Sequence, residues 1–236
     1  VNNGKICIVF SNNSARLSAM NIEQARFNMV ENQIRPWEVL DQQVLDLLYV
    51  VKREDFVPAA YRMLAFSDLE IPIGRGEHMW QPKMEARVLQ ELAVKPSDQV
   101  LEIGTGSGYF AALLAHRAQH VYSVEIQPEL KASGEAGLRR AGVANVTVEL
   151  GDGANGWTKH APCDVIVLTG STPVLPRQFL RQMKVGARLF AVVGSPPVMA
   201  ARLITCTGDG VYNAIDLFET SIAPLANALA GERFSF

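Results

Sequence analysis

The chain has 236 residues, of which 48% are hydrophobic and 19% are charged, so it carries enough apolar material for a large buried core. Its 22 basic residues nearly balance its 24 acidic ones, which leaves no strong field to attract a nucleic acid or an anionic membrane. The three cysteines, Cys7, Cys163 and Cys206, are too far apart for a zinc motif or a disulfide framework, which favours buried free thiols in a reducing cytoplasm.

The N-terminal quarter is expected to be helical after a short leader. Residues 1–19 are rich in Asn and Ser without sustained periodicity, which predicts a disordered leader. Their apolar run KICIVF is too short for a signal peptide or a membrane span, which favours a cytoplasmic protein. Over 21–48, apolar residues recur at helical spacing on both sides of Pro36, which predicts two helices. The positions are Phe27, Val30, Ile34, Leu40, Val44, Leu45 and Leu48.

Residues 53–82 contain the first irregular segments. Pro58 opposes a long helix over 53–68, and IPIGRGEHMWQP (71–82) has the prolines and glycines of a structured loop. Pro82 is suited to the first turn of a helix that continues to about residue 94. The apolar positions that share one face of that helix are Met84, Val88, Leu89 and Leu92. We therefore divide the chain into an N-terminal helical cap with a substrate loop (20–82) and a main domain (83–236).

From residue 99, strand patterns alternate with helix patterns. Strands are expected at 99–104, 120–126, 146–150, 163–170 and 187–194, and helices at 110–118, 129–142 and 175–183. This alternation predicts an α/β fold with a doubly wound, mostly parallel Rossmann-like sheet and helices on both faces. The tail at 201–221 predicts an antiparallel hairpin that turns at 208–210 and closes the sheet edge.

The first strand of this series runs into alternating glycines, in VLEIGTGSGYF. Gly104, Gly106 and Gly108 let the backbone bend sharply and lie close to a ligand, at the turn where doubly wound sheets bind ligands. A dinucleotide fingerprint needs its third glycine at position 109, which is Tyr109, so a dehydrogenase is disfavoured. With Glu102 two residues ahead of the first glycine, the order resembles motif I of S-adenosylmethionine-dependent methyltransferases.

Acids follow the next two strands. Glu125 ends HVYSVE about 20 residues past the glycine turn, where an acid can accept hydrogen bonds from ribose hydroxyls. Asp152 lies in GDG after VTVEL, where the methyltransferase class places a contact to the adenine amino group. Each feature alone could be an ordinary turn or a solvated strand end. Together they predict S-adenosyl-L-methionine binding by Glu102, Gly104, Thr105, Gly106, Ser107, Gly108, Glu125, Ile126, Asp152 and Gly153.

The loops outside the sheet resemble those of one particular methyltransferase family. MVENQIR (29–35), FVP (56–58), IPIG (71–74), QP (81–82), VLEIGTGSGY (100–109) and GDG (151–153) occur in the order found in protein-L-isoaspartate O-methyltransferases, with a looser similarity at APL (223–225). The resemblance implies methylation of the carboxylate of isoaspartyl residues in damaged proteins or peptides. Such a carboxylate is already ionised at neutral pH, so neither a general base nor a metal is expected.

One segment departs from the family pattern. Where members usually read GQTISQP, with a serine hydroxyl for the substrate carboxylate, this chain reads GEHMWQP and places Trp80 at the serine position. Trp80 and His78 are the candidate catalytic residues, and Glu77, Met79 and Gln81 the candidate substrate-binding residues. Alternatively, Trp80 only anchors the loop by packing. A different acceptor, including a small molecule, and a catalytically inactive cofactor-binding protein also stay open, as does the oligomeric state.

Overall fold

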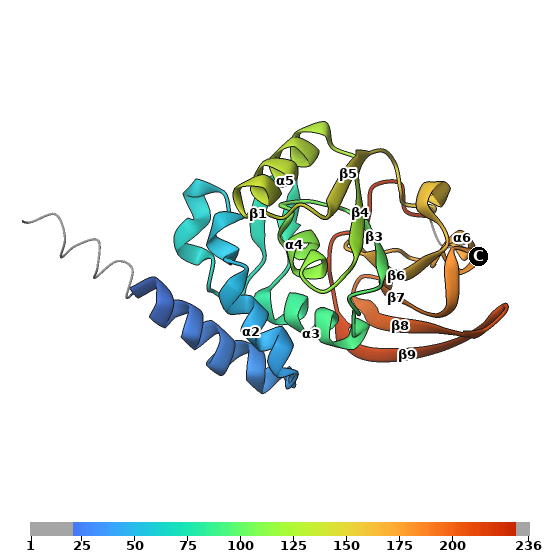
Figure 1. The fold of residues 1–236 in the computed structure, drawn as a ribbon, viewed down its shortest axis with the longest axis horizontal. Coiled ribbons are helices and arrows are strands. Elements are labelled where there is room, and N and C mark those ends of the chain that lie inside the picture. Colours follow the sequence, from blue (N-terminus) through green and yellow to red (C-terminus); the bar gives the residue numbers. More distant parts are fainter. Residues whose placement is uncertain (1–20, 230–236) are drawn as a thin grey trace, which may run out of the picture.

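The computed structural model describes residues 21–229 and centres on one seven-stranded sheet (Figure 1). Its strand order is β5-β4-β3-β6-β7-β8-β9, and β5 to β7 are parallel. The strands are β3 (Gln99–Ile103), β4 (His120–Glu125), β5 (Val146–Leu150), β6 (Cys163–Leu168), β7 (Met183–Ser195), β8 (Val198–Gly208) and β9 (Val211–Thr220). Chain order runs outward from β3 on one side and from β6 on the other, so the sheet has its switch point between these strands.

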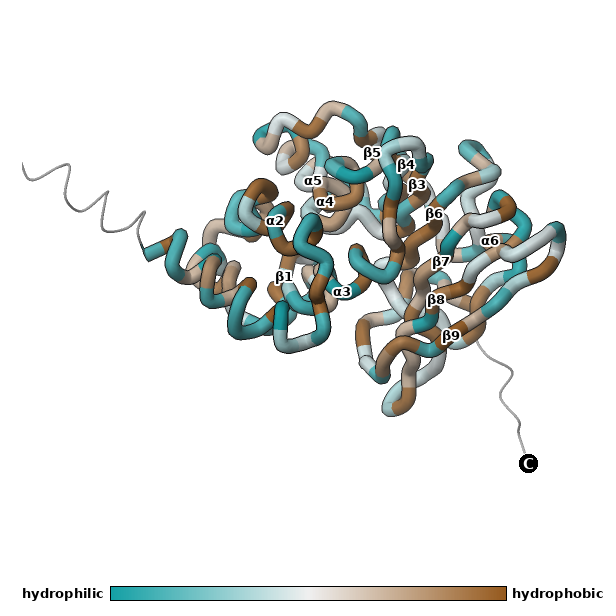
Figure 2. Tube along the Cα trace, turned by 60° about the horizontal axis from the view of Figure 1, so that its bottom comes forward, coloured by the Kyte–Doolittle hydropathy of each residue, from teal (hydrophilic) through white to brown (hydrophobic). Residues whose placement is uncertain are grey.

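Helices pack on both faces of the sheet, as the alternating pattern predicts. They are α3 (Pro82–Leu92), α4 (Tyr109–Ala115), α5 (Pro128–Arg140) and the short α6 (Arg177–Arg181). Adjacent residues of β3 point into different core clusters, Val100 toward α3 and α4 and Leu101 toward Phe179 of α6. Figure 2 shows hydrophobic stretches along the central strands β6 and β7. The expected doubly wound fold is confirmed.

The N-terminal cap contains the two expected helices. Residues 21–29 are α-helical and continue through a π-helical turn (Val30–Ile34) into a 3-10 turn (Arg35–Trp37), which contains Pro36. The next helix, α2 (Gln42–Val50), begins at Asp41, whose side chain accepts a hydrogen bond from the Gln43 amide. The cap shares one apolar core with α3, α4 and the sheet.

Two of the apolar positions predicted for the cap are solvent-exposed instead. Phe27 is 49% exposed, because the buried side of its helix is formed by Arg26, Met29 and Val30. Leu40 is 71% exposed, because it lies in the connection before the helix cap at Asp41. Neither residue therefore contributes to the helix face that packs on the core.

The segment between the cap and α3 is more ordered than predicted. Two 3-10 turns, Arg53–Asp55 and Ala59–Leu64, are followed by an antiparallel hairpin of β1 (Ile71–Gly74) and β2 (Glu77–Met79). Arg75 and Gly76 form its turn with positive φ values. The expected loop is therefore a two-stranded arm that leads directly into α3.

The C-terminal β8–β9 hairpin turns between Gly208 and Val211, as predicted, and Figure 1 shows it at the sheet edge. Cys163 and Cys206 are buried free thiols, while Cys7 and the leader predicted at 1–19 lie outside the described residues. Within the range 21–229, no helix has the length and apolarity needed to cross a membrane.

Candidate active site

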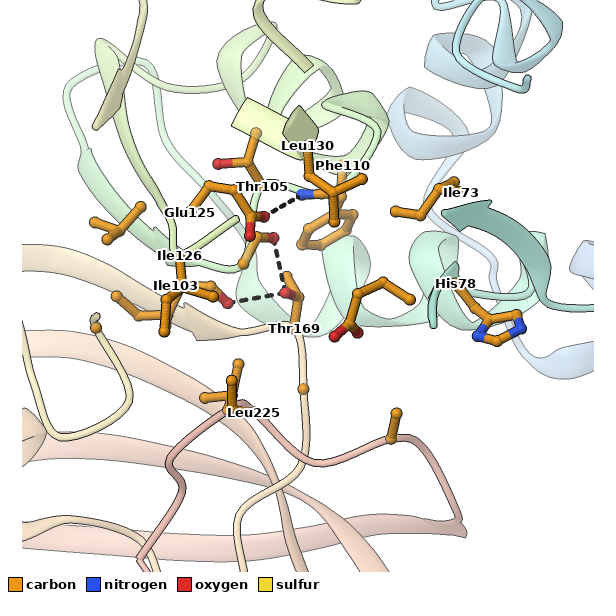
Figure 3. A pocket seen from close by; sticks show the side chains of 18 of the residues that line it. Ile73, His78, Ile103, Thr105, Phe110, Glu125, Ile126, Leu130, Thr169 and Leu225 are labelled. Atoms are coloured by element: carbon orange, nitrogen blue, oxygen red, sulfur yellow. Dashed lines mark hydrogen bonds between the residues drawn. The ribbon is translucent and has the colours of Figure 1, made fainter. Parts of the chain in front are cut away.

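A cavity opens at the carboxyl ends of β3, β4, β5 and β6, beside the switch point of the sheet. Its other walls are the β1–β2 hairpin and the segment 222–226 near the C-terminus. The empty space within the cavity and its open mouth is about 1000 Å³. Figure 3 shows Glu125 and Ile126 on one side of it and Ile73 and His78 of the hairpin on the opposite side.

The glycine turn after β3 forms the floor of the cavity, and its first glycine has no room for a side chain. Gly104 has φ +100°, and a Cβ added to it would lie 2.1 Å from the hydroxyl oxygen of Thr169. That hydroxyl lies 2.8 Å from the carbonyl oxygens of both Ile103 and Gly104, so it fixes the turn (Figure 3). The sequence reasoning missed Thr169, although its position directly after β6 at the same sheet edge was a usable signal.

Two residues of the glycine motif lie behind the turn and do not line the cavity. A Cβ on Gly108 would meet the Gly134 carbonyl oxygen of α5 at 2.9 Å, so this glycine permits close packing of the turn on α5. Glu102 is fully buried, and the Ser123 hydroxyl donates a hydrogen bond to it at 2.5 Å. Burial raises the pKa of Glu102 to about 8, against the opposing effect of the Ser123 hydrogen bond. These two residues shape the turn from outside the cavity.

Glu125 at the end of β4 binds the turn and still faces the cavity. One carboxylate oxygen accepts the Gly106 amide and the other accepts the Gln127 amide, both at 2.9 Å. A carboxylate offers about four lone-pair sites, so each oxygen can accept another hydrogen bond. Glu125 is thereby held in place and keeps acceptor capacity for a ligand.

Asp152 lines the cavity from the turn after β5, the strand next to β4. Its two oxygens accept hydrogen bonds from the Ala154 amide (3.0 Å) and the Asn227 side chain (2.9 Å). The turn is backed by Trp157, since a Cβ on Gly151 would lie 2.4 Å from its ring. All predicted cofactor residues except Glu102 and Gly108 line the cavity: Gly104, Thr105, Gly106, Ser107, Glu125, Ile126, Asp152 and Gly153.

The hairpin supplies the wall opposite these strand ends. Trp80 is only 7% exposed, and its ring packs against Phe110 and Phe190 at centroid distances of 5.4 and 6.0 Å. His78, which is exposed, and Glu77 also line the cavity. Burial raises the pKa of the Glu77 carboxyl, and the charge of Glu125 raises it further, against the opposing effect of His78.

Of the two other predicted substrate-binding residues, only one lines the cavity. Met79 is buried and lines the cavity, whereas Gln81 does not line it. The Gln81 carbonyl instead accepts the Met84 amide at 3.0 Å and so begins α3.

A buried ion pair supports this wall, and no sequence motif marks it. Arg53 is 1% exposed and pairs with Glu85 of α3, which is 3% exposed and lines the cavity. The Arg53 guanidinium also donates to the Trp80 carbonyl at 2.6 Å and lies 5.1 Å from the ring centroid of Tyr109. Within the cap, Arg26 pairs in the same way with Glu54, the residue next to Arg53.

Residues 24–228 of this chain match the family model for protein-L-isoaspartate(D-aspartate) O-methyltransferase. The chain belongs to this family. A relative named protein-L-isoaspartate O-methyltransferase from Gloeobacter violaceus is 42% identical over 167 residues, which cover 71% of this chain and 82% of the relative. A relative from Pelobacter propionicus, named protein-L-isoaspartate O-methyltransferase 2, is 38% identical over 212 residues, which cover 89% of this chain and 94% of the relative.

Solved structures of the family share the fold. A protein-L-isoaspartate O-methyltransferase from Plasmodium falciparum, crystallised with S-adenosyl-L-homocysteine, superposes with a TM-score of 0.74 at 17% identity. That match covers 84% of this chain and 97% of the other. The family membership and the fold thus agree with the resemblance carried by the sequence motifs.

Proposed function

We propose that this chain transfers the methyl group of S-adenosylmethionine to the carboxylate of isoaspartyl residues in damaged proteins. The observation that carries the proposal is one cavity that joins the glycine turn, Glu125 and Asp152 to the hairpin wall. The cofactor end and the acceptor end therefore open into the same space, as a direct transfer between two bound molecules requires.

The residues at the strand ends fit S-adenosylmethionine. The remaining lone pairs of Glu125 suit the two ribose hydroxyls, and Asp152 at the neighbouring strand end suits the adenine amino group. Ile126 and Leu225 supply apolar surface for a planar base. Gly104 and Gly106 line the cavity without side chains, so the backbone of the turn is available to the methionine part of the molecule.

Methyl transfer requires little of the chain beyond placing the cofactor and the acceptor next to each other. When bound, S-adenosylmethionine supplies a methyl group on a positively charged sulfur, and transfer to a carboxylate oxygen forms an O–C bond while the S–C electron pair returns to sulfur. The acceptor is ionised at neutral pH, so no residue has to remove a proton. Trp80 and the apolar side chains beside it exclude water from the acceptor end.

A transfer assay on whole proteins tests this function. A protein aged at neutral pH and a fresh sample of it would be incubated with the enzyme and S-adenosylmethionine labelled on its methyl group. We expect label on the aged sample, released by mild base as methyl esters are, and inhibition by S-adenosylhomocysteine. Equal labelling of both samples, or base-stable label, would contradict carboxylate methylation of damaged residues.

A second acceptor class is favoured by one observation. Among the described residues that line the cavity there is no lysine or arginine, while Glu70 and Glu77 lie at the hairpin, so an amine would meet complementary charge. Trp80→Ser would discriminate between the two acceptor classes, although losing this buried indole is expected to cost about 3–5 kcal/mol of stability. Isoaspartyl activity gained only in the variant would favour a diverged acceptor.

A further inference from the structure

A second hollow adjoins the active-site cavity, and we name it the arginine groove. The empty space within the groove and its open mouth is about 730 Å³. The cap, the hairpin, the glycine turn and α5 line it together, through residues 55–59, Arg62, Ile73, Gly106, Ser107, Leu130, Ser133 and Arg140. The methyl transfer proposed above makes no use of this groove.

The groove and the cavity share a boundary. Ile73, Gly106, Ser107 and Leu130 line both of them. The hairpin meets the glycine turn at this boundary, since a Cβ added to Gly106 would lie 3.1 Å from the Ile73 side chain. A polypeptide substrate is longer than the residue that reacts, and each extended residue adds about 3.3 Å. A chain whose isoaspartyl side chain enters the cavity can therefore extend its neighbouring residues past Ile73 into the groove.

The two hollows differ in charge. Among the described residues, the cavity is lined by no lysine or arginine but by the carboxyl groups of Glu70, Glu77, Glu85, Glu125 and Asp152. The groove is lined by the guanidinium groups of Arg62 and Arg140 and by one carboxyl group, that of Asp55. Coulomb attraction therefore draws an anionic part of a substrate toward the groove rather than toward the cavity wall.

Both guanidinium groups keep donors for a ligand. Arg62, in the 3-10 turn Ala59–Leu64, is exposed, and its side chain makes no hydrogen bond or ion pair to a described residue. Arg140, the last residue of α5, is also exposed and donates one hydrogen bond, to the Asp55 carbonyl at 3.1 Å. A guanidinium carries several N–H donors in a rigid fork that matches the geometry of a carboxylate. Each arginine can therefore still bind an acidic side chain.

We propose that the arginine groove binds an acidic side chain of the substrate polypeptide, a few residues from the isoaspartyl residue, through Arg62 and Arg140. The inference rests on the proposed function, because it takes an isoaspartyl polypeptide as the substrate. The groove then sets which sequences around a damaged residue are preferred, since complementary charge gives specificity and like charge disfavours a partner. The two arginines contact the substrate away from the reacting atoms, so they affect KM rather than kcat.

The test uses isoaspartyl peptides that differ at a single position, which carries glutamate, glutamine or lysine. That position would be moved through about four residues on each side of the isoaspartyl residue, a reach of roughly 13 Å. S-adenosylmethionine would be saturating. At one position or more, kcat/KM for the glutamate peptide should exceed that of its glutamine twin by roughly three- to tenfold, mainly through KM. The lysine peptide should fall below both.

Charge-removing variants show whether the groove causes this preference. In Arg62→Gln and in Arg140→Gln the ratio of kcat/KM between the glutamate and glutamine peptides should fall, and in the double variant it should reach about one. Arg139→Gln removes the same charge from the preceding residue of α5, which is exposed but does not line the groove, and should keep the ratio. A purely structural role of Arg140, through its hydrogen bond to Asp55, would lower activity on all peptides alike. Salt at about 0.5 M should reduce the ratio in the intact enzyme, because it screens exposed charges.

Calorimetry in the presence of S-adenosylhomocysteine measures binding of the same peptides without turnover, and the dissociation constants should show the same preference. A ratio of one at every position in the intact enzyme, a ratio retained by the double variant, or an equal loss in Arg139→Gln would overturn the role of the groove while methyl transfer stands. If no isoaspartyl peptide is methylated or bound, the proposed function fails and this inference fails with it.

Discussion

Replacing Gly104 by alanine tests whether the turn after β3 is built around a missing side chain. Alanine at φ +100° costs about 1–2 kcal/mol, by analogy with the left-handed helical region. The added Cβ would also lie 2.1 Å from the Thr169 hydroxyl oxygen, and such overpacking costs about 1–3 kcal/mol more. Gly104→Ala should therefore lower the free energy of unfolding by about 2–5 kcal/mol in total.

Gly142 offers a matched control, because it has φ +70° and nothing within 4 Å of an added Cβ. Gly142→Ala carries the backbone strain without the collision, so it should lose only about 1–2 kcal/mol. Both variants would be unfolded in urea, and S-adenosylhomocysteine binding would be measured by calorimetry. Only Gly104→Ala should lose binding, because only Gly104 lines the cavity. Equal destabilisation of the two variants, with binding intact in both, would refute this reasoning.

Further substitutions probe the ligand acids and the buried charges. Glu125→Gln should weaken S-adenosylhomocysteine binding roughly 10- to 100-fold in calorimetry, since a hydrogen bond to a charged group is worth about 1.5–3 kcal/mol; unchanged affinity would remove Glu125 from the site. Arg26→Met leaves Glu54 buried without its partner and should cost about 3–5 kcal/mol in urea unfolding, and a loss below about 1 kcal/mol would contradict a structural role for this pair. Burial acts to raise the pKa of Glu149, but hydrogen bonds from Lys159, His160 and Trp157 hold it at about 2, below its ordinary 4.5. Because the fold favours the ionised form, the stability advantage over Glu149→Gln should be complete above about pH 4.5 and disappear as the pH falls toward 2, and a difference independent of pH would argue against this account.

The fold and the cofactor end were predictable because both follow from patterns local in sequence. Each strand of the parallel sheet is a short apolar run, and its carboxyl end is marked by the residue that follows it. The sequence alone therefore assigns Gly104, Glu125 and Asp152 to one edge of the sheet, and they line one cavity. Glu102 shows the limit of this logic, since it belongs to the same motif but lies buried behind the turn.

The acceptor end depends on contacts between segments far apart in the chain. Glu85 belongs to no recognisable sequence motif. Its partner at the cavity is Arg53, which lies 32 residues earlier in the chain. An acid beside the apolar face of α3 is ordinary in sequence and becomes informative only when it is seen to be buried at a cavity. The packing of Trp80 between Phe110 and Phe190 is equally non-local.

The most direct test of the central claim offers the enzyme an isoaspartyl peptide and its normal aspartyl twin at equal concentration in one reaction. S-adenosylmethionine labelled on its methyl group would be the donor, and mass spectrometry would locate the added methyl group. The account predicts one methyl ester per peptide, on the isoaspartyl carboxylate alone, even with Trp80 at the position of the family's serine. Methylation of both twins, or of neither while the cofactor still binds, would contradict it.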